Sequence, residues 1–369
     1  MSKKSGTKTK MSKELYDSST DNKKENERLI SQATTIEVFD TNAIIEILDA
    51  IKKSGKKPGE TIYILELGGA DMKGARISRY NDKVLSFIKK LGYKVKIVNA
   101  EYNETAVKTA VELYGDMFTN AQVDLNDNPK LALEKLKKLH TKGKGFDMIF
   151  SNYVLQHLQN PPEVMSAVES VLSKKGMSVH RVPDDRLKVK GFYTNGKPNK
   201  KANDAATSIV EIFLKTLTRT RTDRKLGGKM FDVCTTGYEE EKGVDFDTVY
   251  DRIATEVIPA SADEQTKITY LKRDFIWYIY ALKEAGEEVE DPVFSKICFD
   301  AAAECEANYE ILKKEFLKKG TAYHYGEHEI IVSHGLELLS EPIKKLDKYR
   351  TLKVEIARVH KLDVKVDLI

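Results

Sequence analysis

The chain has 369 residues, more than one average domain of ~150 residues, and 41% of them are hydrophobic. These values exclude a small fold held together only by disulfides, and they exclude a wholly disordered chain. The 61 basic and 57 acidic residues leave a net charge of +4, which is too small over this length to indicate a nucleic-acid partner. No apolar run approaches the ~20 residues that a membrane-spanning helix needs.

The three cysteines form no CxxC or other close-spaced metal pattern, so we expect neither a disulfide framework nor a structural metal. The N-terminus carries lysines but no apolar segment of the kind found in a secretion signal. We therefore expect a cytoplasmic protein that does not contact membranes.

The first 32 residues are polar and offer few apolar groups to offset the entropy of ordering, which predicts a disordered tail. A basic arm that binds nucleic acid is the alternative, but five acidic residues dilute its charge. Apolar residues at helical spacing from Ile44 to Ile51 predict an amphipathic helix. Residues 61–67 form an apolar run that predicts a buried strand, which stops at Gly68 and Gly69.

Helical and strand patterns alternate after this strand as far as residue 182. Such alternation predicts a mostly parallel sheet with helices on both faces, the doubly wound α/β architecture. The predicted helices cover 82–91, 104–115, 128–140 and 161–172, and the predicted strands cover 94–100, 122–125, 146–150 and 177–182.

The pattern changes after Pro183, where long helical segments replace the alternation. We expect a core over 33–185, a helical cap with closing strands over 186–330, and a C-terminal extension over 331–369. Within the second half, helices are predicted over 204–217, 224–237 and 263–318, and strands over 244–258, 323–332 and 352–366.

Polar or glycine residues follow each predicted strand of the core. In an open parallel sheet, ligands bind at the carboxyl ends of the strands, so these residues are the candidates for a site. Glycines after the first strand let the backbone approach a ligand, and a carboxylate after the second can accept hydrogen bonds from ribose hydroxyls. An acid and a backbone amide after the third strand can meet an adenine edge. The set comprises Glu66, Gly68, Gly69, Glu101, Tyr102, Asp124, Leu125 and Asn152. Tyr102 either flanks the adenine or packs in the core, and a turn residue is the alternative for Asp124.

Three segments of this set resemble the class I (Rossmann-like) S-adenosylmethionine-dependent methyltransferases. Residues 62–68, Ile-Tyr-Ile-Leu-Glu-Leu-Gly, look like the first motif of that family, an acid followed by a glycine turn. Residues 99–103, Asn-Ala-Glu-Tyr-Asn, are similar to its ribose-binding motif. Residues 146–158 and 171–179 match its fourth strand, the following helix and turn, and its fifth strand. The resemblance implies S-adenosylmethionine as cofactor and methyl transfer by in-line displacement.

Candidates for the acceptor side follow the fourth and fifth strands. Tyr153, His157 and Asp185 are the expected catalytic residues, since a methyl acceptor that loses a proton needs at most one general base. A structural hydrogen bond is the alternative for His157. We expect acceptor contacts from Asp184 and Arg186, and from Asp223 and Arg224 at the start of a later segment, for which an exposed helix start is the alternative.

The acceptor itself is predicted to be a small molecule or a peptide side chain, because an aromatic-containing cap suits either. The mild charge and the lack of a proline tetrad after the fourth strand make nucleic acid a poor acceptor, and tRNA or rRNA is the alternative. A second alternative is an inactive S-adenosylmethionine-binding module, suggested by Ala70 where the family usually has glycine. A homodimer is compatible with the sequence. His324, His328 and His334 lack a firm ligand spacing, and we expect no metal there.

Overall fold

The computed structural model describes residues 51, 54–69, 86–114, 118–217, 226 and 248–333. Several predicted segments lie outside these residues: the tail 1–32, most of the helix that ends at Ile51, the helix 224–237 and the strands within 352–366.

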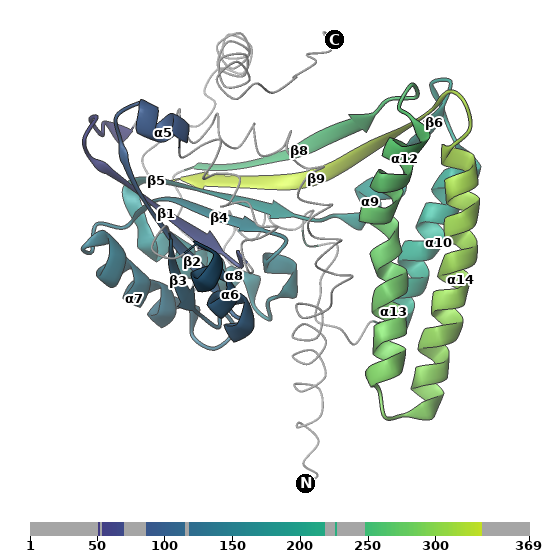
Figure 1. Cartoon of the computed structure of the whole chain (residues 1–369), viewed down its shortest axis with the longest axis horizontal. Coiled ribbons are helices and arrows are strands. Elements are labelled where there is room, and N and C mark those ends of the chain that lie inside the picture. Colours follow the sequence, from purple (N-terminus) through teal and green to yellow (C-terminus); the bar gives the residue numbers. More distant parts are fainter. Residues whose placement is uncertain are drawn as a thin grey trace.

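Five parallel strands form the core of one mixed sheet (Figure 1). Their order is β3-β2-β1-β4-β5, with β1 in the middle. Mostly apolar side chains allow β1 and β4 to be buried on both faces, as parallel strands between helices require. The bounds are Thr61–Leu67 for β1, Lys94–Glu101 for β2, Thr119–Gln122 for β3, Phe146–Asn152 for β4 and Leu172–Val182 for β5.

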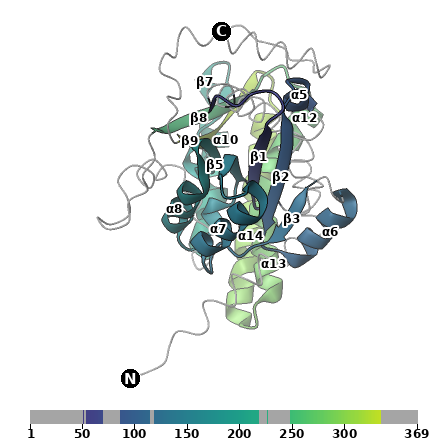
Figure 2. The same cartoon turned by 90° about the vertical axis from the view of Figure 1, so that its left-hand side faces the viewer.

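Helices connect these strands and cover the sheet. Asn128 and Asn160 each precede a proline and accept a hydrogen bond from the first turn, so α7 and α8 start in the same way. The two helices bury Leu133, Val164 and Val168 against one face of the sheet. α6 lies beside β2 and β3 (Figure 2). The bounds are Ser86–Lys90 for α5, Glu104–Tyr114 for α6, Pro129–Thr141 for α7 and Pro161–Val171 for α8, with a 3₁₀ turn, η3, over Leu155–His157.

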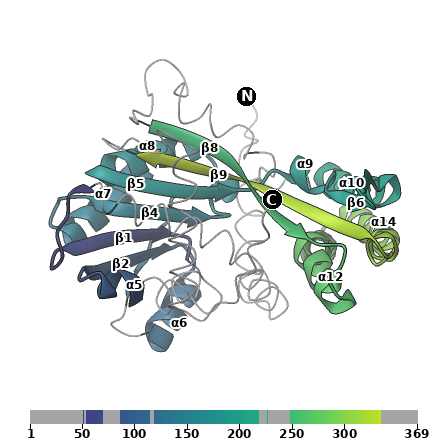
Figure 3. The same cartoon turned by 90° about the horizontal axis from the view of Figure 1, so that it is seen from above.

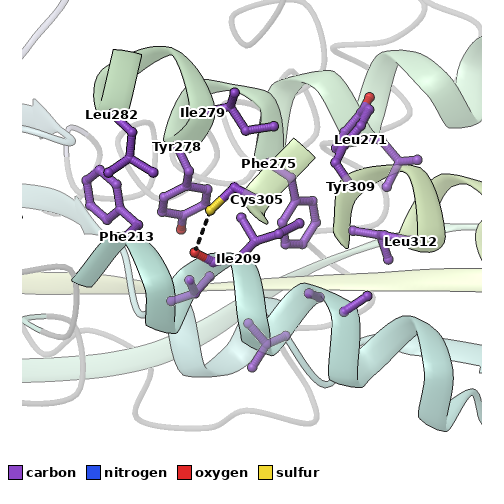
Figure 4. Packing of buried hydrophobic residues seen from close by; sticks show 14 of the residues in the cluster. Ile209, Phe213, Leu271, Phe275, Tyr278, Ile279, Leu282, Cys305, Tyr309 and Leu312 are labelled. Atoms are coloured by element: carbon purple, nitrogen blue, oxygen red, sulfur yellow. Dashed lines mark hydrogen bonds between the residues drawn. The ribbon is translucent and has the colours of Figure 1, made fainter. Parts of the chain in front are cut away.

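The second half of the chain builds a helical cap beside the sheet (Figure 1). Figure 4 shows its core, in which Phe213 of α10, Tyr278 of α13 and Cys305 of α14 pack together. Burial raises the pKa of the Cys305 thiol to about 12, so this cysteine is an inert packing group. The cap helices are α9 (Asp185–Lys188), α10 (Lys200–Thr216), α12 (Glu264–Leu271), the π-helical turn η5 (Lys272–Ile276), α13 (Trp277–Glu288) and α14 (Pro292–Phe316).

One long strand, β9 (Thr321–Ser333), belongs to both parts of the molecule (Figures 1 and 3). Its second half pairs antiparallel with β5, from Met177↔Ser333 to Val182↔His328. Its start pairs with β6 (Phe192–Thr194), which forms a hairpin with β7 (Lys197–Pro198). β8 (Thr248–Ile258) runs antiparallel along most of β9. The predicted doubly wound, mostly parallel α/β sheet with a helical cap and closing strands is confirmed.

Three predicted boundaries are wrong. The strand predicted over 122–125 is β3, at Thr119–Gln122, because an edge strand needs no apolar run; Asp124 instead accepts a hydrogen bond from the Asn126 amide and turns the chain. α10 starts at Lys200 and not at residue 204, since Asn199 caps it. β5 starts at Leu172, ahead of the predicted 177, and its pairing with β4 is irregular before Met177.

Replacing Asp147 with alanine is expected to lower the free energy of unfolding by ~2–3 kcal/mol. The buried carboxylate accepts hydrogen bonds from Lys56 Nζ at 2.7 Å and from the Tyr63 amide at 2.8 Å, and so ties β4 to the start of β1. Its removal leaves both donors without this partner. Urea unfolding measures the loss. Asp204→Ala, which removes an exposed ion pair with Lys200, should cost less than ~0.5 kcal/mol, and equal losses would contradict the prediction.

Candidate active site

The strand order reverses at β1, and this reversal marks the candidate site. The chain runs from β1 outward to β2 and β3, then returns to the other side of β1 as β4 and continues to β5. Such a switch point leaves a crevice at the carboxyl ends of the two central strands, where open α/β sheets bind ligands. The carboxyl ends of β1 and β4 point toward the side where the cap lies (Figures 1 and 3).

A tight turn of two glycines follows β1. Gly68 has a φ of +66°, and its amide donates to the Ala100 carbonyl of β2 at 2.7 Å. A Cβ on Gly68 would lie 2.5 Å from Cγ2 of Val154, and a Cβ on Gly69 would overlap the Asn99 Oδ1 atom. Both positions therefore need glycine.

Two buried carboxylates stand at the ends of β1 and β2. Glu66 and Glu101 are 3% and 2% exposed. Asn152, at the end of β4, donates from Nδ2 to Glu66 Oε1 over 3.4 Å. Glu101 Oε1 accepts from the Asn103 amide at 3.0 Å, which orients this carboxylate at the start of α6. Neighbouring strands thus bring Glu66, Glu101 and Asn152 to one edge of the sheet.

The remaining predicted cofactor residues lie where β2 and β3 end. Tyr102 is half-buried, and its carbonyl accepts a hydrogen bond from Gln122 Nε2 at 3.3 Å. Asp124 is half-buried two residues beyond β3, and Leu125 is buried in the core between the sheet and α7. The Val123 amide donates to the Glu101 carbonyl at 2.8 Å and so keeps these two chain segments adjacent.

On the acceptor side, Tyr153 follows β4 in a left-handed conformation, with a φ of +56°. An L side chain adopts this conformation at an energetic cost, and such strain concentrates at functional sites. The Tyr153 hydroxyl lies 3.3 Å from the Tyr325 hydroxyl of β9. Tyr153, at the carboxyl edge of the parallel sheet, therefore meets a strand that continues into the cap.

Buried charges surround this tyrosine pair. Asp184 and Asp185 follow β5, as predicted, and lie at the start of α9. They are 3% and 1% exposed. Lys188 Nζ lies 3.7 Å from Asp185 Oδ1 and 5.2 Å from the centroid of the Tyr325 ring. Such a cation over an aromatic ring is held by the charge distribution of the ring.

Sequence reasoning missed the second cation over the Tyr325 ring, Arg273 in the π-helical turn η5. Its guanidinium lies 4.5 Å from the Tyr325 ring centroid and 4.6 Å from that of Tyr270. Asp274 pairs with it through two hydrogen bonds of 2.6 and 2.8 Å, and both residues are buried. π-helical turns occur frequently at functional sites. The only signal in the sequence is an adjacent Arg-Asp pair within an otherwise apolar helical segment.

The other predicted acceptor residues are spread over η3, α9 and the part of the chain that the structure does not describe. His157 is half-buried in η3. Arg186 has its backbone in α9, and Asp223 and Arg224 lie outside the described residues. His324 is exposed on β9, which runs unbroken through Gly326. In the described part of the chain, no helix is long and apolar enough to cross a membrane.

His180 is buried in β5 between two serines. Its Nδ1 lies 2.7 Å from Ser151 Oγ, and its Nε2 lies 2.9 Å from Ser178 Oγ. Burial lowers the pKa of this imidazole from 6.5 to about 3, so it stays neutral at physiological pH. His180 is therefore a structural group that links β4 to β5.

A pocket of about 520 Å³ lies away from this edge of the sheet. The β6–β7 hairpin and the start of β9 line it, through Tyr193, Asn195 and His324 among others. Its lining shares no residue with the candidate site at the ends of β1, β2 and β4.

Comparison with known proteins identifies the domain. A family model described as a methyltransferase domain matches residues 82–224, from the start of the α5 region to beyond α10. No match is found among curated proteins. The chain is similar to the YcgJ protein of Bacillus subtilis, with 10% identity, coverage of 79% of this chain and 99% of that one, and a TM-score of 0.38. It is also similar to phosphoethanolamine N-methyltransferase 2 of Haemonchus contortus in complex with phosphomonomethylethanolamine and S-adenosylhomocysteine, with 12% identity, coverage of 79% and 52%, and a TM-score of 0.36.

The residues at the switch point fit S-adenosylmethionine. Gly68 and Gly69 carry no side chain at the end of β1, and buried carboxylates lie at the ends of β1 and β2. Carboxylates in these places can accept hydrogen bonds from the hydroxyl and amino groups of such a ligand. Residues 82–224 therefore resemble a methyltransferase domain, and this match begins after β1 and the glycine turn.

Proposed function

We propose that this protein is an S-adenosylmethionine-dependent methyltransferase, which acts on a small-molecule or peptide acceptor bound where the ends of β4 and β5 meet the cap. The observation that carries the proposal is the contact between the hydroxyls of Tyr153 and Tyr325, 3.3 Å apart. This contact joins the carboxyl edge of the parallel sheet to the cap. The buried charged residues Asp185, Lys188 and Arg273 lie around it. An acceptor of limited size suits such an enclosed junction better than a long nucleic acid does.

On the cofactor side, we assign Gly68 and Gly69 to the methionine part and Glu101 to the ribose hydroxyls. Glu66 and Asn152, whose side chains are hydrogen-bonded to each other, are also assigned to cofactor contact. Tyr102, Asp124 and Leu125 are assigned to the adenine, because they lie where β2 and β3 end. When bound, S-adenosylmethionine supplies a methyl group on a positively charged sulfur that a nucleophile displaces in line.

On the acceptor side, positioning matters most, because a displacement of this kind needs the reacting atoms held ~3–3.5 Å apart in a water-poor site. The Tyr153 hydroxyl is assigned to hold the nucleophilic atom of the acceptor. Asp185 is assigned to accept the proton that an amine or hydroxyl acceptor loses, and Lys188 Nζ lies 3.7 Å from its Oδ1 atom. Asp184 and Arg186 are assigned to acceptor contacts, as are Asp223 and Arg224. No step is assigned to His157.

The test is the formation of S-adenosylhomocysteine in the presence of S-adenosylmethionine and defined acceptor pools. Separate pools hold small amines, carboxylic acids and phenols, short peptides, and total tRNA with rRNA. Turnover with a small-molecule or peptide pool supports the proposal. Turnover with RNA alone contradicts the acceptor class, and cofactor binding without turnover in any pool favours an inactive module.

Tyr153→Phe is expected to lower kcat at least tenfold and to leave the affinity for S-adenosylmethionine within twofold of wild type. The substitution keeps the ring and removes only the hydroxyl that faces Tyr325. The first effect is measured as turnover of the acceptor that the pools identify, and the second by calorimetry with S-adenosylmethionine. Tyr280→Phe, at an exposed position on α13, is the matched control and should change neither. Full activity of Tyr153→Phe would remove this hydroxyl from the mechanism.

A further inference from the structure

A row of polar side chains crosses three strands beneath the glycine turn. Glu66 of β1 is in register with Asn99 of β2, and Asn99 is in register with Asn120 of β3. Side chains in register on parallel strands point to the same face of the sheet. Asn99 is fully buried, although its neighbours Val98 and Ala100 belong to the apolar core on the opposite face. The row thus places two amide side chains on the face over which the turn folds.

The two asparagines form a chain of hydrogen bonds that ends on the turn. The Gly69 amide donates to Asn99 Oδ1 at 3.2 Å, and Asn99 Nδ2 donates to Asn120 Oδ1 at 3.1 Å. A backbone N–H can only donate, so Gly69 requires the oxygen of Asn99 to face it. Asn99 Nδ2 must then face Asn120, which in turn presents its own oxygen. The orientation of the turn and of both amides is therefore set as one unit.

Packing couples the turn to Asn99 as well. A Cβ on Gly69 would overlap the Asn99 Oδ1 atom and would come within 3.2 Å of Glu66 Cγ. The backbone of the turn therefore rests directly on the Asn99 side chain. Any movement of this side chain displaces Gly69.

Stability alone does not favour an asparagine at position 120. Its Nδ2 atom is buried, and within the described structure it has no hydrogen-bond partner. A buried donor without a partner destabilises the folded state, whereas an apolar residue would avoid that penalty. The oxygen of the same amide is the group that orients Asn99.

We propose that Asn99 and Asn120 are positioning residues for S-adenosylmethionine, because they fix the Gly69 backbone at the cofactor turn. Neither belongs to the residues assigned above to cofactor contact. Asn99 acts through the Gly69 amide, and Asn120 acts through Asn99 from a strand that makes no bond to the turn in the described structure. The affinity for the methyl donor is then set partly by a side chain two strands away from the glycine turn.

The experiment compares Asn99→Leu, Asn120→Leu and the double variant, all in the full chain. Calorimetry with S-adenosylmethionine measures the Kd, and hydrogen exchange of the Gly69 amide is followed without any ligand. We expect the Kd to rise at least tenfold for Asn99→Leu and about threefold for Asn120→Leu. The double variant should bind no more weakly than Asn99→Leu, because both act on the same bond. Gly69 exchange should be faster in all three.

Asn203→Leu is the matched control. Asn203 bonds the backbone of Phe192 in the cap, through 3.0 and 3.2 Å contacts, so its loss should lower Tm and leave both readouts unchanged. A Kd within twofold of wild type for Asn99→Leu, with Gly69 still protected, would overturn the proposal, as would additive effects in the double variant. Where Asn99→Leu does not fold, Asn120→Ala on the edge strand must still speed Gly69 exchange, and unchanged exchange there would overturn the proposal.

Discussion

Gly68→Ala is expected to weaken the binding of S-adenosylmethionine at least 30-fold. The new Cβ would lie 2.5 Å from Cγ2 of Val154, in the segment that follows β4, and the residue would keep a left-handed backbone at φ +66°. Either the glycine turn or the segment after β4 must move, and both border the switch point. A distortion of ~2 kcal/mol or more at the turn corresponds to this loss of affinity. Calorimetry with S-adenosylmethionine measures it.

Gly143→Ala is the matched control for backbone strain. Gly143 has a similar φ of +78°, but a Cβ there would meet nothing within 4 Å. The variant should lose ~1–2 kcal/mol of stability from strain and keep its affinity for S-adenosylmethionine. Equal affinities of the two variants would show that the crowding at Gly68 has no bearing on cofactor binding.

The stability of the protein is expected to fall steeply below pH 6.5 because of His180. The unfolded chain binds a proton on this imidazole below pH 6.5, whereas the folded chain binds none until about pH 3. Between these values the unfolded state holds more protons, so lowering the pH favours unfolding. The contribution of His180 is complete above pH 6.5 and falls by ~1.4 kcal/mol per pH unit below it, or ~2 kcal/mol by pH 5.

Urea unfolding of wild type and His180→Asn at pH 7.0 and 5.0 tests this expectation. The variant is less stable at both values, since it loses the contacts with Ser151 and Ser178, but the difference between the two pH values should shrink by ~2 kcal/mol. His140→Gln is the control: burial also lowers the pKa of His140, but its side chain is only partly buried and its effect should be smaller. An unchanged difference in His180→Asn would refute the assignment.

Local sequence patterns predicted much of the fold. The segment from Asn128 to Val182 carries capping asparagines, prolines at helix starts and two apolar strands, so each element is specified by its own residues. The predicted position of β3 was wrong, because an edge strand with half-buried side chains has no apolar pattern. The predicted start of α10 was too late in the chain, because the N-cap role of Asn199 was not predicted.

The cofactor side and the acceptor side of the candidate site also differ in how far local sequence patterns predict them. The positions of the cofactor candidates were predictable, because each lies at or just beyond the end of a strand and the order of strands brings them together. The groups around Tyr325 were not, because Lys188, Arg273 and Tyr325 come from α9, η5 and β9. No local pattern indicates that these three elements meet, and their contact depends on how the cap packs onto the sheet.

The sharing of β9 between sheet and cap also constrains the order of folding. Among the described residues, β5 receives its outer partner from 328–333, so that edge stays open until the ribosome has produced the whole cap. Open strand edges promote pairing with other chains. The nascent chain is therefore most prone to aggregation while the cap is being made. Truncations that end within α14 should accumulate as insoluble protein, because they leave the edge of β5 permanently exposed.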